Sequence, residues 1–256
     1  MQATLTILGS GTSMGVPTLG CDCNVCTSGD QRDRRSRPSV AIRWDDHVVL
    51  IDAGPDFREQ ALREALTHID AVLYTHGHAD HILGLDDLRP LSFKKGRIPL
   101  YAERETSEIL KRVFNYTFSA ENNYPTKARV DLHELPETLT LHDTTFTRIP
   151  VQHGEQMISG FRFGNAAYLT DMSDIPEASL EMLRGVEVLV LDALRKTPHP
   201  SHANVERATQ YIDRIGPRVA YFTHISHELG HAATEAELPS HIRMAYDGLR
   251  IPIELK

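Results

Sequence analysis

Three histidines and one aspartate lie within six positions of this chain, directly after a short apolar run of the kind that forms β-strands. They are His76, His78, Asp80 and His81, in the stretch 71–81. Neutral imidazole nitrogens and carboxylate oxygens are the ligands that borderline divalent metals such as Zn²⁺ prefer. The spacing therefore predicts a metal site, which needs further ligands from elsewhere in the chain.

Other candidate ligands also follow apolar, β-prone runs. The residues found at or just past the ends of five such runs are His76, His153, Asp171, Asp192 and His224. Because the carboxyl ends of neighbouring parallel strands meet at one edge of a sheet, where α/β proteins bind ligands, we expect these side chains to converge. Taken singly, each would fit equally well as a buried core residue or a turn cap.

A single ion does not accommodate His78, Asp80 and His81 together, because adjacent side chains diverge. Two ions that share a bridging carboxylate resolve this geometry. Metals about 3.5–4 Å apart hold a bridging hydroxide near neutral pH and neutralise a developing oxyanion. The cluster therefore predicts hydrolytic chemistry that suits phosphate esters.

All three cysteines of the chain, Cys21, Cys23 and Cys26, lie within six residues. Such a set is a poor disulfide framework and a good zinc-binding one, which favours a reducing cytoplasm as the location of the protein. Structural zinc is tetrahedral, so three thiolates need a fourth ligand. The charged run 31–37 that follows is expected to be a solvated loop, with contact to an anion as the alternative.

Composition is that of an ordinary globular protein of 256 residues, with 41% hydrophobic and 24% charged residues. The formal net charge of -8 argues against a broad nucleic-acid-binding surface, so nucleic acid is not the expected partner. The first residues lack the basic and apolar pattern of a secretory signal, and no apolar run is long enough to span a membrane. We therefore expect a cytoplasmic protein without a membrane partner.

Strands alternate with amphipathic segments, which indicates layered α/β packing, and without linkers or repeats we expect one domain over residues 1–256. Strands are expected at 3–8, 40–43, 48–51, 71–74, 98–101, 139–141, 145–150, 160–163, 166–170, 186–191 and 219–223. Helices are expected at 55–69, 83–91, 105–118, 178–184 and 204–215, and a surface loop at 119–127.

The string Thr75-His-Gly-His-Ala-Asp-His81 resembles the T-H-x-H-x-D-H signature of the metallo-β-lactamase superfamily. Asp52-Ala-Gly54 and the spaced His153, Asp171 and His224 resemble the remaining motifs of that family, so the likeness spans nearly the whole chain. The resemblance implies an α/β fold, a four-layer αββα sandwich.

The resemblance also implies a role for each ligand. One ion would bind His76, His78 and His153, the second would bind Asp80, His81 and His224, and Asp171 would bridge the two. Asp52 would hydrogen-bond the ligand loop from behind, although a plain turn cap explains its position equally well. Asp80, as a metal ligand, would belong to the catalytic residues.

Within the superfamily, the chain is most similar to the phosphodiesterase branch typified by the phosphoribosyl cyclic phosphate enzyme of the carbon–phosphorus lyase pathway. The likeness rests on the cysteine cluster and on Thr223-His-Ile-Ser-His227, and it implies that His227 completes a structural zinc site with Cys21, Cys23 and Cys26. The segment around His202 resembles the part of that branch that carries the general acid. His199 is the rival for this role.

The sequence thus predicts a cytoplasmic, binuclear metal-dependent hydrolase that cleaves a small cyclic or nucleotide-like phosphodiester through a metal-bridging hydroxide. Its cofactors would be two divalent ions, Zn²⁺ or Mn²⁺, and one structural zinc. Two alternatives remain open: a tRNA 3′-processing endonuclease, and a non-hydrolytic metal-binding accessory protein of quinone-cofactor biosynthesis. A homodimer is a further expectation that comes from the branch alone.

Overall fold

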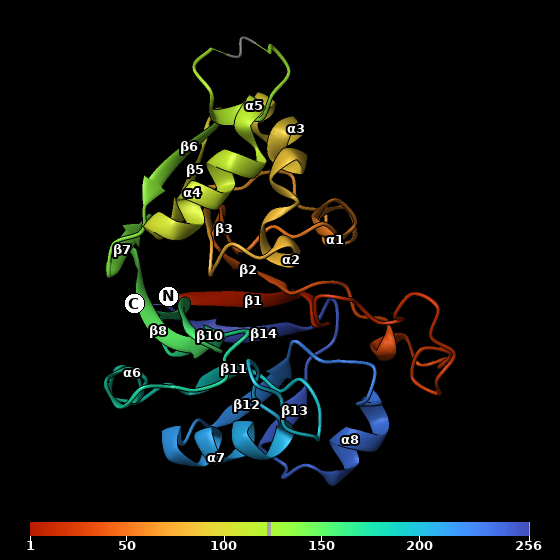
Figure 1. The fold of residues 1–256 in the computed structure, drawn as a ribbon. Helices are drawn as coiled ribbons and strands as arrows, with labels where there is room; N and C mark the ends of the chain where they lie inside the picture. Colours follow the sequence, from red (N-terminus) through yellow and green to blue (C-terminus); the bar gives the residue numbers. More distant parts are fainter. Residues whose placement is uncertain (122–123, 256) are drawn as a thin grey trace.

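The computed structural model describes residues 1–121 and 124–255, and its strands form two seven-stranded β-sheets (Figure 1). The first sheet contains β1 (Gln2–Gly9), β2 (Ser39–Trp44), β3 (His47–Ile51), β4 (Ala71–Leu73), β5 (Ile98–Ala102), β6 (Val130–Glu134) and β14 (Arg250–Glu254), in the order β14-β1-β2-β3-β4-β5-β6. The second contains β7 (Thr138–Leu141), β8 (Thr144–His153), β9 (Gln156–Phe163), β10 (Ala166–Leu169), β11 (Val188–Asp192), β12 (Val219–Thr223) and β13 (Ile242–Met244), in the order β13-β12-β11-β10-β9-β8-β7.

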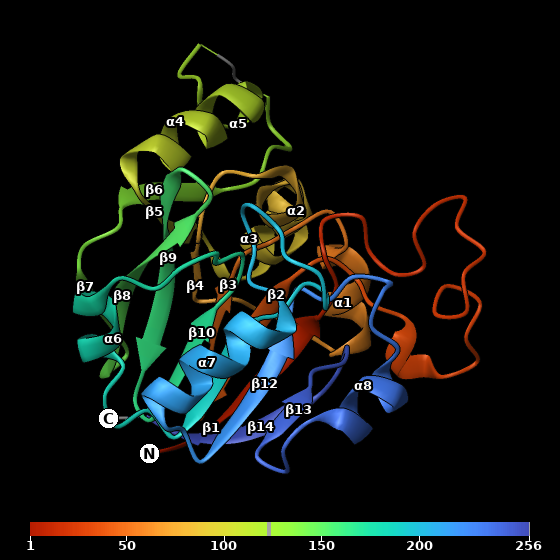
Figure 2. The ribbon, with the colours of Figure 1, turned by 60° about the horizontal axis from the view of Figure 1, so that its bottom comes forward.

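Helices cover the outer faces of the two sheets, so the layers follow the order αββα (Figures 1 and 2). The first sheet carries α1 (Phe57–Arg63), α2 (Ala79–Ile82), α3 (Arg89–Lys95), α4 (Arg104–Val113) and α5 (Asn115–Phe118). The second carries α6 (Glu177–Met182), α7 (Val205–Ile215) and α8 (His231–Glu237). The expected fold class, an α/β sandwich of four layers, is confirmed.

Three separate hydrophobic clusters fill the three spaces between these layers. Along β2, Val40 and Ile42 point into the cluster between the sheets, whereas Ala41 points toward the helices of the first sheet. On β8, Phe146 joins the central cluster and Ile149 joins the cluster beneath the helices of the second sheet. This alternation with a period of two residues is what a strand buried on both faces requires.

Parallel strands lie in both sheets and fix where the loops meet. Strands β3 to β6 pair in parallel in the first sheet, and β10 to β13 do so in the second. The loops after β3, β4, β10, β11 and β12 therefore leave from the carboxyl ends of parallel strands, the place where open α/β sheets bind ligands.

Several expected helices are shorter than the sequence pattern suggests. The helix expected at 55–69 ends at Arg63, because Ala65 adopts a positive φ of 50° that a right-handed helix does not allow. The segment 83–91 divides into a 3₁₀ turn, Leu85–Leu88, and α3, while 105–118 divides at Phe114 into α4 and α5. Helix α7 begins as expected, with Asn204 accepting a hydrogen bond from the Arg207 backbone N–H.

Strands β6, β13 and β14 were not expected from the sequence, because their local signals are weak; β6 and β13 pair with the preceding strands β5 and β12, and β14 pairs with β1 at the other end of the chain. The expected surface loop 119–127 includes residues 122–123, which lie outside the described residues; Tyr124 is exposed. Among the described residues, no helix combines the length and apolar character needed to cross a lipid bilayer.

The expectation of a solvated loop at 31–37 is wrong for two of its residues, because Asp33 and Arg35 are buried, at 5% and 2% exposed. The Arg35 guanidinium donates to Asp33 and to the carbonyls of Ser226 and Leu229. A buried guanidinium is stable only when its donors are satisfied in this way. The arginine ties the N-terminal segment to the loop after β12.

Candidate metal centre

The four residues of the opening cluster lie where β4 ends and α2 begins. His76 and His78 occupy the loop, while Asp80 and His81 lie within the single turn of α2. Gly54, in the loop after β3, makes this approach possible, because a Cβ there would lie only 1.9 Å from the Asp80 carbonyl oxygen.

Ligands from the second sheet arrive at the same edge. His153 is the last residue of β8, while Asp171 and His224 follow the ends of β10 and β12. Asp171 and His224, together with Asp52 after β3, adopt positive φ values of 57°, 56° and 64°. Backbone strain of this kind in residues other than glycine is concentrated at functional sites.

Two groups of donor atoms form at this edge, and in each the donors lie within 4.8 Å of one another. The first contains His76, His78 and His153, and the second contains Asp80, His81, Asp171 and His224. Asp171 also lies in a group with His153 and His202, so its carboxylate is within reach of ligands from both sets. The two sets predicted from the sequence are brought together, with Asp171 between them.

The ring orientations of His81 and His153 are fixed by hydrogen bonds at Nδ1. Asp52 accepts from the backbone and hydroxyl of Thr75 at 2.8 Å and from Nδ1 of His81 at 2.7 Å. Nδ1 of His153 donates to the Ser201 carbonyl at 2.8 Å. Both contacts leave Nε2 as the free nitrogen, which is the usual arrangement behind a metal-bound histidine. Asp52 thus lies where the sequence predicted it.

In the second donor group, neighbouring carboxylates raise the pKa values of two histidines. Burial would lower the pKa of His224, but Asp171 and Asp80 raise it to about 10, and the same carboxylates raise the pKa of His81 well above its usual value. Burial would raise the pKa of Asp171, yet His224 and His81 bring it well below its usual range. Without a metal, the carboxylates of this group therefore favour the protonated form of both imidazoles.

The Nε2 atoms of His81 and His224 are poorly placed for hydrogen bonds. Nε2 of His81 lies 3.2 Å from Asp171 Oδ2, and Nε2 of His224 lies 3.1 Å from Asp171 Oδ1. Neither nitrogen makes a hydrogen bond of acceptable angle, and Oδ2 of Asp80 lacks a partner as well. Buried polar atoms normally have partners, so a cation among these nitrogen and oxygen donors fits the site.

A histidine-aspartate pair stands beside the donor groups. His202, in the segment between β11 and α7, places Nδ1 2.8 Å from Oδ2 of Asp192, the last residue of β11. Its ring stacks on that of His224, with centroids 4.7 Å apart and planes at 11°. The sequence indicated Asp192 only as another residue at a strand end; its partnership with His202 was missed, because it depends on the fold of the 194–204 segment.

His202 and His199 both line a cavity of about 460 Å³ next to the donor groups. The His199 ring lies 5.1 Å from that of His202, and its Nδ1 faces the backbone N–H and hydroxyl of Ser201 at 3.3 Å. Burial, followed by His202 and Arg195, lowers the pKa of His199. Only His202 has a carboxylate behind it, so the geometry favours it over its rival as a proton donor.

The cysteine cluster meets His227 as the sequence predicted. The sulfur atoms of Cys21, Cys23 and Cys26 lie 3.2, 3.5 and 3.5 Å from Nδ1 of His227. Backbone N–H groups point at two of the sulfur atoms, and the one from Cys26 contributes most to lowering the pKa of Cys23 to about 6. Three thiols and an imidazole at these distances fit a closed, tetrahedral zinc site.

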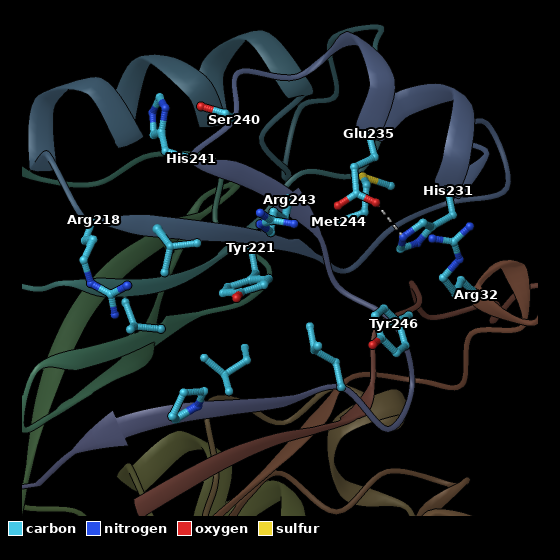
Figure 3. Close-up of a pocket in the computed structure, with 15 residues that line it drawn as sticks. Arg32, Arg218, Tyr221, His231, Glu235, Ser240, His241, Arg243, Met244 and Tyr246 are labelled. Atoms are coloured by element: carbon cyan, nitrogen blue, oxygen red, sulfur yellow. Dashed lines mark hydrogen bonds and ion pairs between the residues drawn. The ribbon is translucent and has the colours of Figure 1, made fainter. Parts of the chain in front are cut away.

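A larger cavity of about 710 Å³ opens elsewhere, beside edge strands β13 and β14 (Figure 3). Tyr221 and Arg243 of the second sheet, and Arg218 just before β12, project toward it, and on its rim Nε2 of His231 lies 3.1 Å from a carboxylate oxygen of Glu235 in α8. Its lining includes none of the described donor residues of the metal groups. Size alone therefore does not mark the candidate site; the donor chemistry does.

The chain is similar to known proteins in both sequence and fold. A family model described as "Beta-lactamase superfamily domain" matches residues 47–225. A crystal structure described as a new diphosphatase from the PhnP family is 53% identical, with a TM-score of 0.94, and the match covers 100% of this chain and 98% of that one. Zinc-bound PqqB from Methylobacterium extorquens shares the fold at 23% identity, with a TM-score of 0.74 over 97% and 99% of the two chains.

A curated relative, named octanoyltransferase, comes from Porphyromonas gingivalis and is 39% identical over 98% of this chain. The match covers 51% of that relative, so the chain spans about half its length. The name therefore describes a protein of about twice this length, and the likeness covers only part of it.

Proposed function

This chain belongs to the metallo-β-lactamase superfamily, and from that premise we propose that it is a metal-dependent phosphodiesterase acting on a small phosphodiester. The observation that carries the proposal is the pair of donor groups around Asp171, with the His202–Asp192 pair directly beside them. The likeness to a diphosphatase of the PhnP family supports chemistry at phosphorus.

In this proposal each donor group holds one divalent ion, Zn²⁺ or Mn²⁺. The ions would be held by His76, His78 and His153 on one side and by Asp80, His81 and His224 on the other, with Asp171 shared. When bound, such a pair supplies a Lewis acid for the phosphoryl group and makes water a usable nucleophile at neutral pH. The separate cysteine group with His227 would hold a structural zinc.

The protein's own residues perform the remaining tasks. Asp52 holds His81 and Thr75, so that the ligand loop keeps its shape when substrate arrives. Asp192 holds Nδ1 of His202 and leaves Nε2 as the nitrogen that gives a proton to the departing alkoxide. The side chain of His202 is 12% exposed, which gives it access to a substrate in the adjoining cavity.

A panel of substrates tests this proposal against the alternatives. The metal-loaded protein would be assayed on bis(p-nitrophenyl) phosphate, cyclic nucleotides, small diphosphates and a precursor tRNA, with His202→Ala and chelator-treated protein as controls. We expect turnover of a small phosphodiester that is lost in both controls. Cleavage of precursor tRNA alone would replace the proposal with a tRNA-processing role, and no hydrolysis by fully loaded protein would support an accessory role.

A further inference from the structure

Some histidines lie outside the groups described above, and three of them gather at one corner of the sandwich. His47 opens β3, His142 occupies the turn between β7 and β8, and His68 precedes Asp70 in the segment before β4. The corner therefore joins segments from both sheets. His47 opens β3 and Asp52 directly follows it, so the corner lies about 16 Å from Asp52, which holds the ligand loop of the candidate metal centre.

Three of these side chains bring donor atoms together. The donors of His47, Asp70 and His142 lie within 4.8 Å of one another, the same spacing as in the groups of the candidate metal centre. Nδ1 of His47 is 3.6 Å from Oδ2 of Asp70, and the rings of His47 and His142 stack 3.8 Å apart at 13°. We propose that His47, Asp70 and His142 form an additional binding site for a divalent transition metal such as Zn²⁺ or Cu²⁺.

Neighbouring contacts hold this corner in place. Oδ2 of Asp70 accepts the backbone N–H of Val48 at 2.7 Å, which fixes the carboxylate beside His47. His68 directs Nε2 at the Asp46 carbonyl at 2.7 Å, so this nitrogen is already engaged and His68 is not counted as a ligand. Two imidazoles and one carboxylate are a ligand set that suits zinc and copper, with remaining positions left for water.

This site is more exposed than the second donor group, whose four residues are all buried. The side chains of His47 and Asp70 are 33% and 19% exposed, and His142 lies on the surface. An ion would enter directly from solvent and would link the β7–β8 turn to the first sheet. Because such an ion binds the folded chain, it would stabilise the packing of the two sheets at this end.

The chain contains one tryptophan, and it lies at this corner. The ring of Trp44 is 5.4 Å from that of His47 and 6.2 Å from that of Phe146. A paramagnetic ion bound to His47 would quench Trp44 fluorescence strongly, whereas an ion at the distant candidate centre would quench it much less. Intrinsic fluorescence therefore reports on this site.

The test is a titration of the purified protein with Cu²⁺, without added zinc, followed by Trp44 fluorescence. Two variants remove a ligand while keeping the backbone interactions. In His142→Asn, the new asparagine tolerates the positive φ of 46° at that position. In Asp70→Asn, the amide oxygen remains as an acceptor for the Val48 N–H. His133→Asn, at an exposed histidine on β6, is the matched control.

We expect saturable quenching in the native protein and in His133→Asn, with affinity for Cu²⁺ at least about tenfold lower in His142→Asn and Asp70→Asn. Circular dichroism would establish that both variants are folded. Non-saturable quenching in the native protein, or equal affinity in the ligand variants and the control, would overturn the proposal.

Discussion

Asp192 and His202 form a residue pair that lies beside the two donor groups of the candidate centre and belongs to neither. The carboxylate is fully buried, and burial raises its pKa although the hydrogen bond with His202 opposes this effect. A buried carboxylate that contacts a histidine through Nδ1 fixes the orientation of the ring. Asp192 is therefore a positioning residue, and His202 is the group proposed to meet the substrate.

We predict that Asp192→Asn lowers kcat for a phosphodiester by about 10- to 100-fold at unchanged metal content, whereas His202→Ala lowers it by about 10²–10⁴-fold. The double variant should be no slower than His202→Ala, because Asp192 acts through His202. Steady-state kinetics with metal analysis would measure this. Losses that multiply in the double variant would contradict the assignment.

His224 provides a pH-dependent prediction for the metal-free protein. Its pKa in the fold is raised to about 10, whereas that of an unfolded histidine is about 6.5. The ion pair with Asp171 therefore contributes its full stability below pH 6.5, and this contribution is lost as the pH rises through 10. Metal binding must displace the same proton, so metal affinity should rise with pH over this window.

Urea unfolding of chelator-treated native protein and of His224→Gln at pH 6.5, 8 and 10.5 measures the effect. The stability difference between the two should shrink as the pH rises. A difference that is constant over this window would show that the proton on His224 does not stabilise the metal-free fold.

Residues at strand ends could be predicted because both the strand pattern and the ligand are local features of the sequence. His76, His153, Asp171 and His224 all lie where the pattern placed them. The burial of Arg35 was not predictable in this way, since its acceptor on Ser226 is 191 positions away. A run of charged residues is expected to be exposed to solvent, because the sequence does not show the distant residues that bury and pair it in the fold.

At the scale of elements, the N-terminal loop and the loop after β12 act as one unit. Ile225 donates its N–H to the Ser10 carbonyl, and its own carbonyl accepts from the Thr12 N–H. The cysteine group closes the same two segments through His227, three residues after the donor His224. The pairing of these loops positions one edge of the candidate metal centre.

Arg35→Met should therefore destabilise this unit. The substitution keeps much of the side-chain volume but removes the Arg35 hydrogen bonds to two carbonyls and the buried charge that balances Asp33, at a cost of about 3 kcal/mol in the free energy of unfolding. Chemical denaturation would measure it. Arg34→Met, at the exposed neighbouring arginine, is the matched control and should change stability by less than about 0.5 kcal/mol. Equal effects of the two variants would contradict the role given to Arg35.

Removal of one thiolate tests the structural site. We predict that Cys26→Ser lowers bound zinc by one ion per chain and lowers the unfolding temperature, because three ligands hold zinc more weakly than four. Elemental analysis combined with thermal unfolding would measure both effects. Unchanged zinc content and stability would show that the three cysteines and His227 do not bind zinc.

Element lengths were the least predictable part of the fold. The amphipathic pattern of 55–69 continues beyond Arg63, but the positive φ at Ala65 turns the chain away. Strand β14 carries Pro252 and forms an edge of its sheet, so only its pairing with β1 reveals it. Local patterns located most of the elements, while tertiary pairing set where they end.

At the scale of the molecule, the sandwich itself creates the candidate centre. His76, His78, Asp80 and His81 come from the first sheet, and His153, Asp171 and His224 come from the second. Each of the two donor groups takes ligands from both sheets, so neither sheet alone provides a complete group. The fold class was predictable from motif order, whereas the meeting of the two sheets at this edge required the structure.

The central claim, two ions around Asp171 that serve phosphodiester hydrolysis, is tested most directly by measuring turnover against bound metal. Chelator-treated protein that retains the zinc of the cysteine group would receive Zn²⁺ or Mn²⁺ stepwise, with bis(p-nitrophenyl) phosphate as substrate. We predict that turnover becomes complete at two further ions per chain and that Asp171→Asn does not reach it. Full turnover with one further ion, or in the metal-free protein, would contradict the claim.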